Sequence, residues 1–374
     1  CVCPSLPPGL GVRALCCCRR TMMMGPETLC PLSCMVRVTG WDPHHSKGGQ
    51  PLHKHSLSRD GMTTLSASGW VVDAQQGLVV VPMELLRPFV GVSPPSPHLW
   101  LDETHTPGPL QEQWLVRGTH LELTFRAPPQ SPPTQHPPHK FHQLSARLRG
   151  FVDCPQTMGW MVDPESGDLP SLEDAHVPMV AIVQVEWPST DTVSSSATAR
   201  CGQDCRQLLQ DTWDTCLRRL WVPRMNRSSP PDTGEGCFQL GQPLFLVASP
   251  LGFLASQTLV SGVYTGCISQ FSPDGSLLLT DVVFMSGMDG APVAMAPLCA
   301  EDPIPLLGMH VLLPDLAYVP HNANEGPLSV CIGAFHLLSR LAEVTGSPAI
   351  KALLEQGAEQ KSCEGASVSA QEEP

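Results

Sequence analysis

The chain has 374 residues with a net charge of −13, and 40 of its residues are proline and 31 glycine. The negative charge argues against a nucleic-acid partner, because phosphates call for a basic surface. No apolar run approaches the roughly 18 to 20 residues that cross a bilayer, so we expect no membrane partner. Abundant turn residues and 42% apolar residues instead predict a turn-rich β protein with a substantial core.

The N-terminal stretch shows no pattern of a folded element. Prolines and a cysteine triplet interrupt residues 1–21, whereas a secretory signal needs an uninterrupted apolar centre. We interpret residues 1–32 as disordered or as a gene-model artefact, with the true start at one of three consecutive methionines. A processed leader is the alternative. The candidate start residues are Met22, Met23 and Met24.

The 16 cysteines are unevenly placed, and seven of them lie in the first 34 residues. A secreted domain held by disulfides would space them more regularly. We therefore expect reduced thiols in an intracellular compartment.

Several segments of the first half show strand patterns, in which apolar residues alternate or run continuously between turn signals. Two of these runs flank the turn Gln75-Gln76-Gly77 and predict a β-hairpin. Two others lie inside a loop-rich segment, 92–175, that we interpret as an insertion. The expected strands are 33–40, 68–73, 77–81, 120–125, 142–148 and 179–185.

Residues 187–236 are expected to form a linker with a short helix. Serine and threonine dominate its beginning, and apolar residues recur at helical spacing over 206–222. Asn226 begins a glycosylation sequon, which matters only in a secreted protein.

Three groups of histidines and cysteines were considered as metal ligands. None has the spacing of a known metal motif, because two groups lie in loops and the third lacks a fourth ligand. We expect no metal and no cofactor. The groups are His44, His45, His53 and His55; His136, His139 and His142; and Cys201, Cys205 and Cys216.

The most informative stretch is 287–293, Gly-Met-Asp-Gly-Ala-Pro-Val. Gly287 and Gly290 suit a turn that exposes backbone N–H groups, and Pro292 precedes a run that can re-enter a sheet. The layout resembles the loop Gly-x-Ser-Gly-Gly-Pro-Leu/Val of trypsin-like serine proteases, with Asp289 in the place of the nucleophile. A carboxylate forms no alkoxide, and its charge opposes an oxyanion.

Further motifs around this loop are similar to those of Deg/HtrA-type proteases and follow in the same order. The resemblance implies an all-β, two-barrel trypsin-like fold with a first barrel over 33–186, a second barrel with a closing helix over 237–345, and a disordered tail over 346–374. The motifs are Ser249-Pro250-Leu251-Gly252, Val260-Ser261-Gly262-Val263, 277–281, 305–310, and 330–334 before an amphipathic helix over 335–344.

The same resemblance assigns the other two triad positions. The hairpin pattern places Glu84 where the family has its histidine, and the strand 179–185 places Met179 where it has its aspartate. A carboxylate lacks the second ring nitrogen through which histidine is oriented while it accepts a proton. No triad residue is intact, and the former oxyanion loop is Gly287, Met288 and Asp289. The alternative that another serine, such as Ser286, replaces the nucleophile lacks a histidine placed to activate it.

The order of the motifs and the acidic nucleophile loop resemble the N-terminal half of peroxisomal (glyoxysomal) leader-peptide processing proteases. That family resembles two trypsin-like units in tandem, of which the first has lost its triad. The resemblance implies a non-catalytic unit of a peroxisomal serine endopeptidase that processes leader peptides of matrix proteins. Its expected partners are protein substrates, the active unit or further copies of itself.

The chain departs from this family because it contains neither the active second unit nor a C-terminal import signal. We interpret it as a fragment of a peroxisomal protein; without import it would be cytoplasmic. A stand-alone pseudoprotease that binds other proteins is the alternative.

Overall fold

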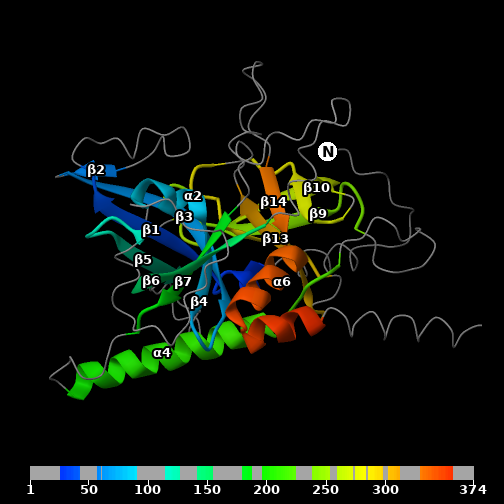
Figure 1. Cartoon of the computed structure of the whole chain (residues 1–374). Coiled ribbons are helices and arrows are strands. Elements are labelled where there is room, and N and C mark those ends of the chain that lie inside the picture. Colours follow the sequence, from blue (N-terminus) through cyan, green and yellow to red (C-terminus); the bar gives the residue numbers. More distant parts are fainter. Residues whose placement is uncertain are drawn as a thin grey trace, which may run out of the picture.

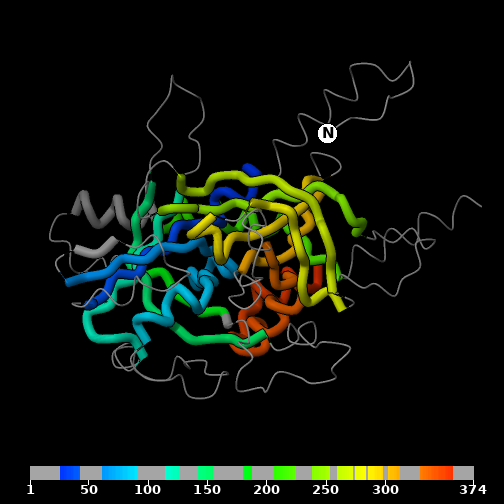
Figure 2. Tube along the Cα trace, turned by 90° about the horizontal axis from the view of Figure 1, so that it is seen from above, coloured from blue at the N-terminus to red at the C-terminus, as the bar shows by residue number. Residues whose placement is uncertain are grey.

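Two β-barrels lie side by side, and helices cover their lower faces in the view of Figure 1. The view from above separates the same two groups of strands (Figure 2). The computed structural model describes residues 26–42, 57–59, 61–90, 114–126, 141–154, 179–187, 196–224, 238–252, 259–272, 274–283, 285–297, 302–311 and 329–356.

The first barrel is a closed antiparallel sheet of six strands. Its order is β1-β5-β6-β7-β4-β3, and the pairing of β3 with β1 closes the ring, while β2 adds to β3 outside it. The strands are β1 (Ser33–Trp41), β2 (Leu57–Arg59), β3 (Met62–Asp73), β4 (Leu78–Pro82), β5 (His120–Arg126), β6 (Phe141–Asp153) and β7 (Met179–Val185).

The second barrel repeats this plan. Its order is β12-β9-β10-β11-β14-β13, the pairing of β12 with β13 closes it, and β8 pairs in parallel with β13 outside the ring. Two closed six-stranded antiparallel barrels confirm the predicted all-β, two-barrel trypsin-like fold. The strands are β8 (Leu220–Trp221), β9 (Pro243–Ala248), β10 (Gly262–Phe271), β11 (Leu277–Thr280), β12 (Pro292–Met295), β13 (Ile304–Val311) and β14 (Ser329–Gly333).

The predicted hairpin is formed by β3 and β4. Its turn is fixed by the Asp73 carboxylate, which accepts a hydrogen bond from the Gln76 N–H at 2.9 Å, and by Gly77, whose φ of 65° suits glycine. All five residues of β4 are buried because β-branched and apolar side chains face the barrel core on one side and its surroundings on the other. The hairpin therefore sets the position of the segment that follows β4.

Helix α4 (Ser196–Leu217) lies along the outside of the first barrel (Figure 1). It has 22 residues, so it is longer than the expected short helix and begins inside the stretch that was expected to be a linker. Its buried Trp213 donates a hydrogen bond from Nε1 to the Pro31 carbonyl oxygen at 3.0 Å and packs against the Phe125 ring, with centroids 4.8 Å apart. Tertiary packing thus stabilises the C-terminal turns of the helix.

Helix α6 (Ala334–Thr345) closes the second barrel and also reaches the first. Its Arg340 forms an ion pair with Asp153 on β6 at 3.2 Å. Beyond Gly346, residues 348–356 are helical, so the prediction of a disordered tail from 346 is wrong for this part. Ser347 is buried and donates a hydrogen bond to Asp73 at 2.5 Å, which ties the segment to the β3–β4 turn. Residues 357–374 lie outside the described part.

Two other sequence expectations need correction. Leu29 and Leu32 are completely buried in the first barrel's core, so residues 26–32 are folded, whereas 1–25 lie outside the described residues. The segment 92–175 is not an insertion throughout, because it supplies β5 and β6, two of the six barrel strands. Local patterns predict the strands at 120–125 and 142–148, but they do not reveal which distant parts of the chain bury these strands and residues 26–32.

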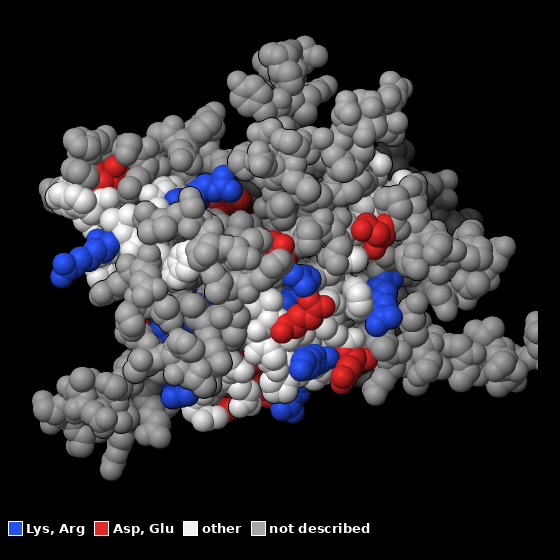
Figure 3. Space-filling model, viewed as in Figure 1, with Lys and Arg blue, Asp and Glu red and all other residues white. Residues whose placement is uncertain are grey.

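Among the described residues, no helix is long and apolar enough to cross a membrane. Charges of both signs alternate on the described part of the face in Figure 3.

Four buried serines join the two barrels. Ser33 at the start of β1 donates to the Val247 carbonyl oxygen at 2.8 Å, and Ser261 donates to the Ser33 carbonyl oxygen at 3.2 Å. The Ser68 hydroxyl donates to the Gly287 carbonyl oxygen at 2.7 Å and accepts from the Ser249 N–H at 2.8 Å. The barrel junction is therefore hydrogen-bonded as well as apolar.

We expect Ser68→Ala to lower the free energy of unfolding by about 1 to 3 kcal/mol, because it leaves a buried carbonyl and a buried N–H without their partner. Urea unfolding measures the change. Ser269→Ala, at an exposed position of β10, is the matched control and should change the same quantity by less than about 0.5 kcal/mol. Equal stability of Ser68→Ala and the wild type would contradict this account of the junction.

Candidate functional site

The loop that resembles a nucleophile loop, residues 285–291, lies against the first barrel. Gly287 and Gly290 both have positive φ, 92° and 85°. A Cβ added to Gly290 would lie 2.1 Å from the Ser68 carbonyl oxygen and 2.6 Å from Pro82 Cδ. Only glycine therefore permits the close approach between this loop and the ends of β3 and β4.

Asp289 is held at the seam between the barrels by its backbone. Its carbonyl oxygen accepts a hydrogen bond from the Ser68 N–H at 2.8 Å, and the preceding Met288 is completely buried in the second barrel's core. The Asp289 side chain is 17% exposed, with Oδ1 3.8 Å from Nδ1 of His310. The site thus presents a carboxylate where the resemblance expects a hydroxyl.

Two residues with left-handed backbone conformations lie in the neighbouring loops. Leu251 and Ser261 have φ values of 50° and 53°, which β-carbon-bearing residues adopt only at an energetic cost. Hydrogen bonds hold both: the Leu251 N–H donates to the Ser286 carbonyl oxygen at 2.9 Å, and the Ser261 N–H donates to the Ser249 hydroxyl at 3.1 Å. The loops at the seam are therefore tightly constrained.

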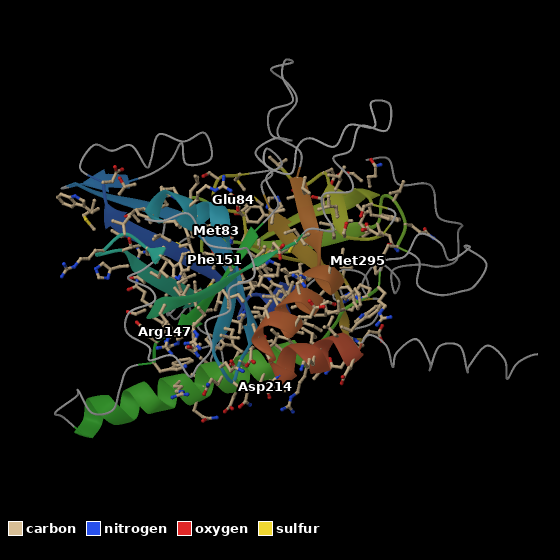
Figure 4. All side chains as sticks on the ribbon, in the orientation of Figure 1. Met83, Glu84, Arg147, Phe151, Asp214 and Met295 are labelled. Atoms are coloured by element: carbon tan, nitrogen blue, oxygen red, sulfur yellow. The ribbon has the colours of Figure 1, made fainter. Side chains whose placement is uncertain are left out.

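Glu84 lies on the one-turn helix α2 (Met83–Leu86), directly after β4 (Figure 4). Its side chain is 16% exposed, and one carboxylate oxygen lies 4.0 Å from the Arg87 guanidinium. Burial raises the pKa of the Glu84 carboxyl, while the Arg87 charge opposes that shift. Desolvation therefore favours the neutral acid at this position.

Met179 begins β7, beside the same end of β4. The next residue, Val180, pairs with Pro82, and Met179 itself pairs with Asp153 of β6. Pro82 is thus close to all three matched positions. It precedes Glu84 by two residues, and it pairs with Val180, the neighbour of Met179. A Cβ added to Gly290, the residue after Asp289, would lie 2.6 Å from Pro82 Cδ. The backbone brings the three matched positions, 84, 179 and 289, to one region of the seam.

His310 is a residue of this region to which the sequence analysis assigned no role. It lies on β13, is completely buried, and its Nε2 is 2.7 Å from the Ser329 hydroxyl. Burial lowers the pKa of the imidazole to about 4. Its backbone also shapes the loop, because its carbonyl oxygen accepts from the Gly290 N–H and its N–H donates to the Ala291 carbonyl oxygen, each at 2.8 Å.

Ser329, His310 and Asp289 are residue types found in catalytic triads, but their setting does not suit that chemistry. Ser329 is only 2% exposed and His310 is inaccessible, so a substrate carbonyl has no path to the hydroxyl. The separation of 3.8 Å between Nδ1 and the carboxylate is also too long for a hydrogen bond. The histidine is better explained as a buried support of the loop.

The sequence groups considered as metal ligands fall largely outside the described residues. Of the three histidine and cysteine groups, His142 lies on β6, and Cys201, Cys205 and Cys216 lie on α4. Within the described ranges, no cluster of three or more histidine, cysteine or acidic residues is arranged to hold a metal ion. The cysteines with described side chains are free thiols: Cys30, Cys34, Cys154, Cys216, Cys267 and Cys331.

No protein-family model and no curated protein matches this chain. The solved structures that are similar to it include the following two. A crystal structure of Deg5 has 11% sequence identity and a TM-score of 0.36, and covers 86% of this chain and 91% of its own. Rv3671c from M. tuberculosis, in the inactive form of a serine-to-alanine mutant, has 10% identity and a TM-score of 0.33, and covers 93% of this chain and 98% of its own. The trypsin-like fold is assigned from the strand topology.

We expect His310 to make the protein less stable in acid. The unfolded state binds a proton at about pH 6.5 and the folded state only at about pH 4, so stability falls as the pH drops between these values. The loss should be on the order of 3 kcal/mol. Urea unfolding across this range should show a smaller pH slope for His310→Asn. Ser329→Ala, which keeps the imidazole, is the control and should retain the slope.

Glu84 should act in the opposite direction. Its raised pKa means that the folded state prefers the neutral acid, so its contribution is present below the unfolded pKa and lost as the pH rises through the folded value. Glu84→Gln should therefore be more stable than the wild type at neutral pH, and this gain should vanish towards pH 4. The exposed Glu186→Gln is the control, with a change of less than about 0.5 kcal/mol in thermal or urea unfolding. A Glu84→Gln variant less stable than the wild type at neutral pH would refute this account.

Proposed function

We propose that this chain is a non-catalytic trypsin-like unit that supports or regulates an active serine endopeptidase, one that processes leader peptides of peroxisomal matrix proteins. The observation that carries the proposal is the carboxylate of Asp289 in a loop built like a nucleophile loop. The trypsin-like double barrel supports it, and the sequence motifs support the choice of enzyme class and compartment.

The chemistry of the three matched positions favours a non-catalytic role. A serine nucleophile requires a base that takes its proton and donors that stabilise the oxyanion. Asp289 would place a negative charge beside a developing oxyanion, and Glu84 is a carboxyl whose pKa is raised by burial, without the second ring nitrogen of a histidine. Position 179 carries methionine, which offers no charge to orient a base.

A scaffold of this kind acts through binding. The two barrels hold a rigid seam with hydrogen-bonded loops, and such surfaces recognise extended protein segments or a sister unit without cutting them.

Support for an active unit and stand-alone protein binding differ in their partner. Mixing the purified chain with peroxisomal matrix proteins and an active-site serine probe distinguishes them, because only the first role retains a probe-labelled endopeptidase on the immobilised chain.

The catalytic part of the proposal has a direct test with a fluorophosphonate probe, which labels activated serines. The wild-type chain should show no labelling. Asp289→Ser alone should also stay unlabelled, because Glu84 cannot serve as an oriented base. The triple variant Glu84→His, Met179→Asp, Asp289→Ser is expected to label above the single variant, and its heat-denatured form is the control. Stoichiometric labelling of the folded wild type would overturn the proposal.

A further inference from the structure

Two cysteines from distant parts of the sequence lie at one corner of the first barrel. Cys30 lies in the folded segment before β1, and Cys216 lies in the last turn of α4. The Trp213 indole donates to the carbonyl oxygen of Pro31, the residue after Cys30, at 3.0 Å. Cys216 follows Trp213 by three residues, so both side chains are on the same face of the helix. The helix therefore presents Cys216 towards the segment that carries Cys30.

The two thiols also influence each other electrostatically. A negative charge on Cys30 contributes to raising the pKa of Cys216, so each thiol lies within range of the other's charge. Cys30 is half-buried, and Cys216 is 8% exposed. A small reagent thus reaches Cys30 more easily than Cys216.

We propose that Cys30 and Cys216 are a redox pair, and that a small disulfide such as oxidised glutathione converts them into an intramolecular disulfide that joins α4 to the N-terminal segment. Both cysteines are free thiols in the structure, which is the reduced state of the pair.

The corner where they meet also includes the second barrel. The Cys30 thiol donates a weak hydrogen bond to the Ser261 carbonyl oxygen at 3.7 Å. Three residues later, Ser33 bonds to Val247 of β9. A disulfide at Cys30 would therefore fix α4 to the segment that connects the two barrels, and it would remove the thiol donor from Ser261.

The exchange balances without any further reactant. The Cys30 thiolate attacks one sulfur of oxidised glutathione, forming a mixed disulfide and releasing one glutathione thiolate. The Cys216 thiolate then attacks the Cys30 sulfur and releases the second glutathione. Two protein thiols lose two electrons and two protons, and one glutathione disulfide becomes two glutathione thiols.

The other described thiols are poorer candidates. Cys34 and Cys331 are completely buried and Cys154 nearly so, which hinders attack on a reagent. Cys267 is half-buried like Cys30, but it lies on β10 of the second barrel. It is therefore the matched control for a cysteine of similar exposure at another place.

Burial raises the pKa of both Cys30 and Cys216 to about 11. Since the thiolate is the attacking species, the reaction should be slow at neutral pH. Its rate should rise about tenfold for each unit by which the pH is increased, as long as the pH stays below the thiol pKa. The raised pKa values thus determine how fast the pair responds.

The experiment treats the folded, reduced full chain with oxidised glutathione at pH 9 and maps its peptides by mass spectrometry without reduction. The expected product is the Cys30–Cys216 linked peptide, together with a higher urea midpoint that dithiothreitol reverses. Cys267→Ser should keep the link. Cys216→Ser should lose it and accumulate a mixed disulfide of glutathione at Cys30.

The wild-type map alone can refute the proposal, whatever the stability of the variants. Recovery of both cysteines as free thiols, as lasting glutathione adducts, or linked to other cysteines would overturn it.

Discussion

The structure depends on the buried Ser68, through which the first barrel holds two loops of the second. Its hydroxyl donates to the Gly287 carbonyl oxygen and accepts from the Ser249 N–H, while its own N–H donates to the Asp289 carbonyl oxygen. Ser68 is completely buried, so water cannot replace these bonds, and an unpaired backbone group there would be costly. The geometry of the loop around residue 289 is consequently imposed by its contacts with β3.

The same burial determines the charges that the seam tolerates. Burial lowers the pKa of His310 to about 4, so it stays neutral at ordinary pH, and burial raises the pKa of Glu84. Their effects on stability have opposite signs with pH, because burial disfavours a cation in one case and an anion in the other. Perturbed ionisable groups often mark functional sites. Here they lie next to the positions that the resemblance matches to a catalytic triad.

The sequence predicted those features whose cause is local. The β3–β4 hairpin follows from apolar runs around a turn with Gly77, and the loop at 287–293 from its glycines and Pro292. Features that depend on distant partners were missed. Leu29 and Leu32 are buried only because the barrel covers them, and residues 348–356 are ordered because Ser347 bonds to Asp73. The approach of His310 to Asp289 joins a strand and a loop whose pairing no local pattern specifies.

These contacts explain why the conformation of the loop does not depend on the side chain at position 289. The loop is shaped by backbone groups: the Gly290 N–H bonds to the His310 carbonyl oxygen, and the Ser68 N–H bonds to that of Asp289. Such bonds form with any side chain at 289 that fits the partly exposed seam. Gly290 is different, because an added Cβ would collide with the Ser68 carbonyl oxygen. A substitution at 289 therefore leaves these backbone bonds in place, whereas a change at Gly290 or Ser68 would weaken the junction between the barrels.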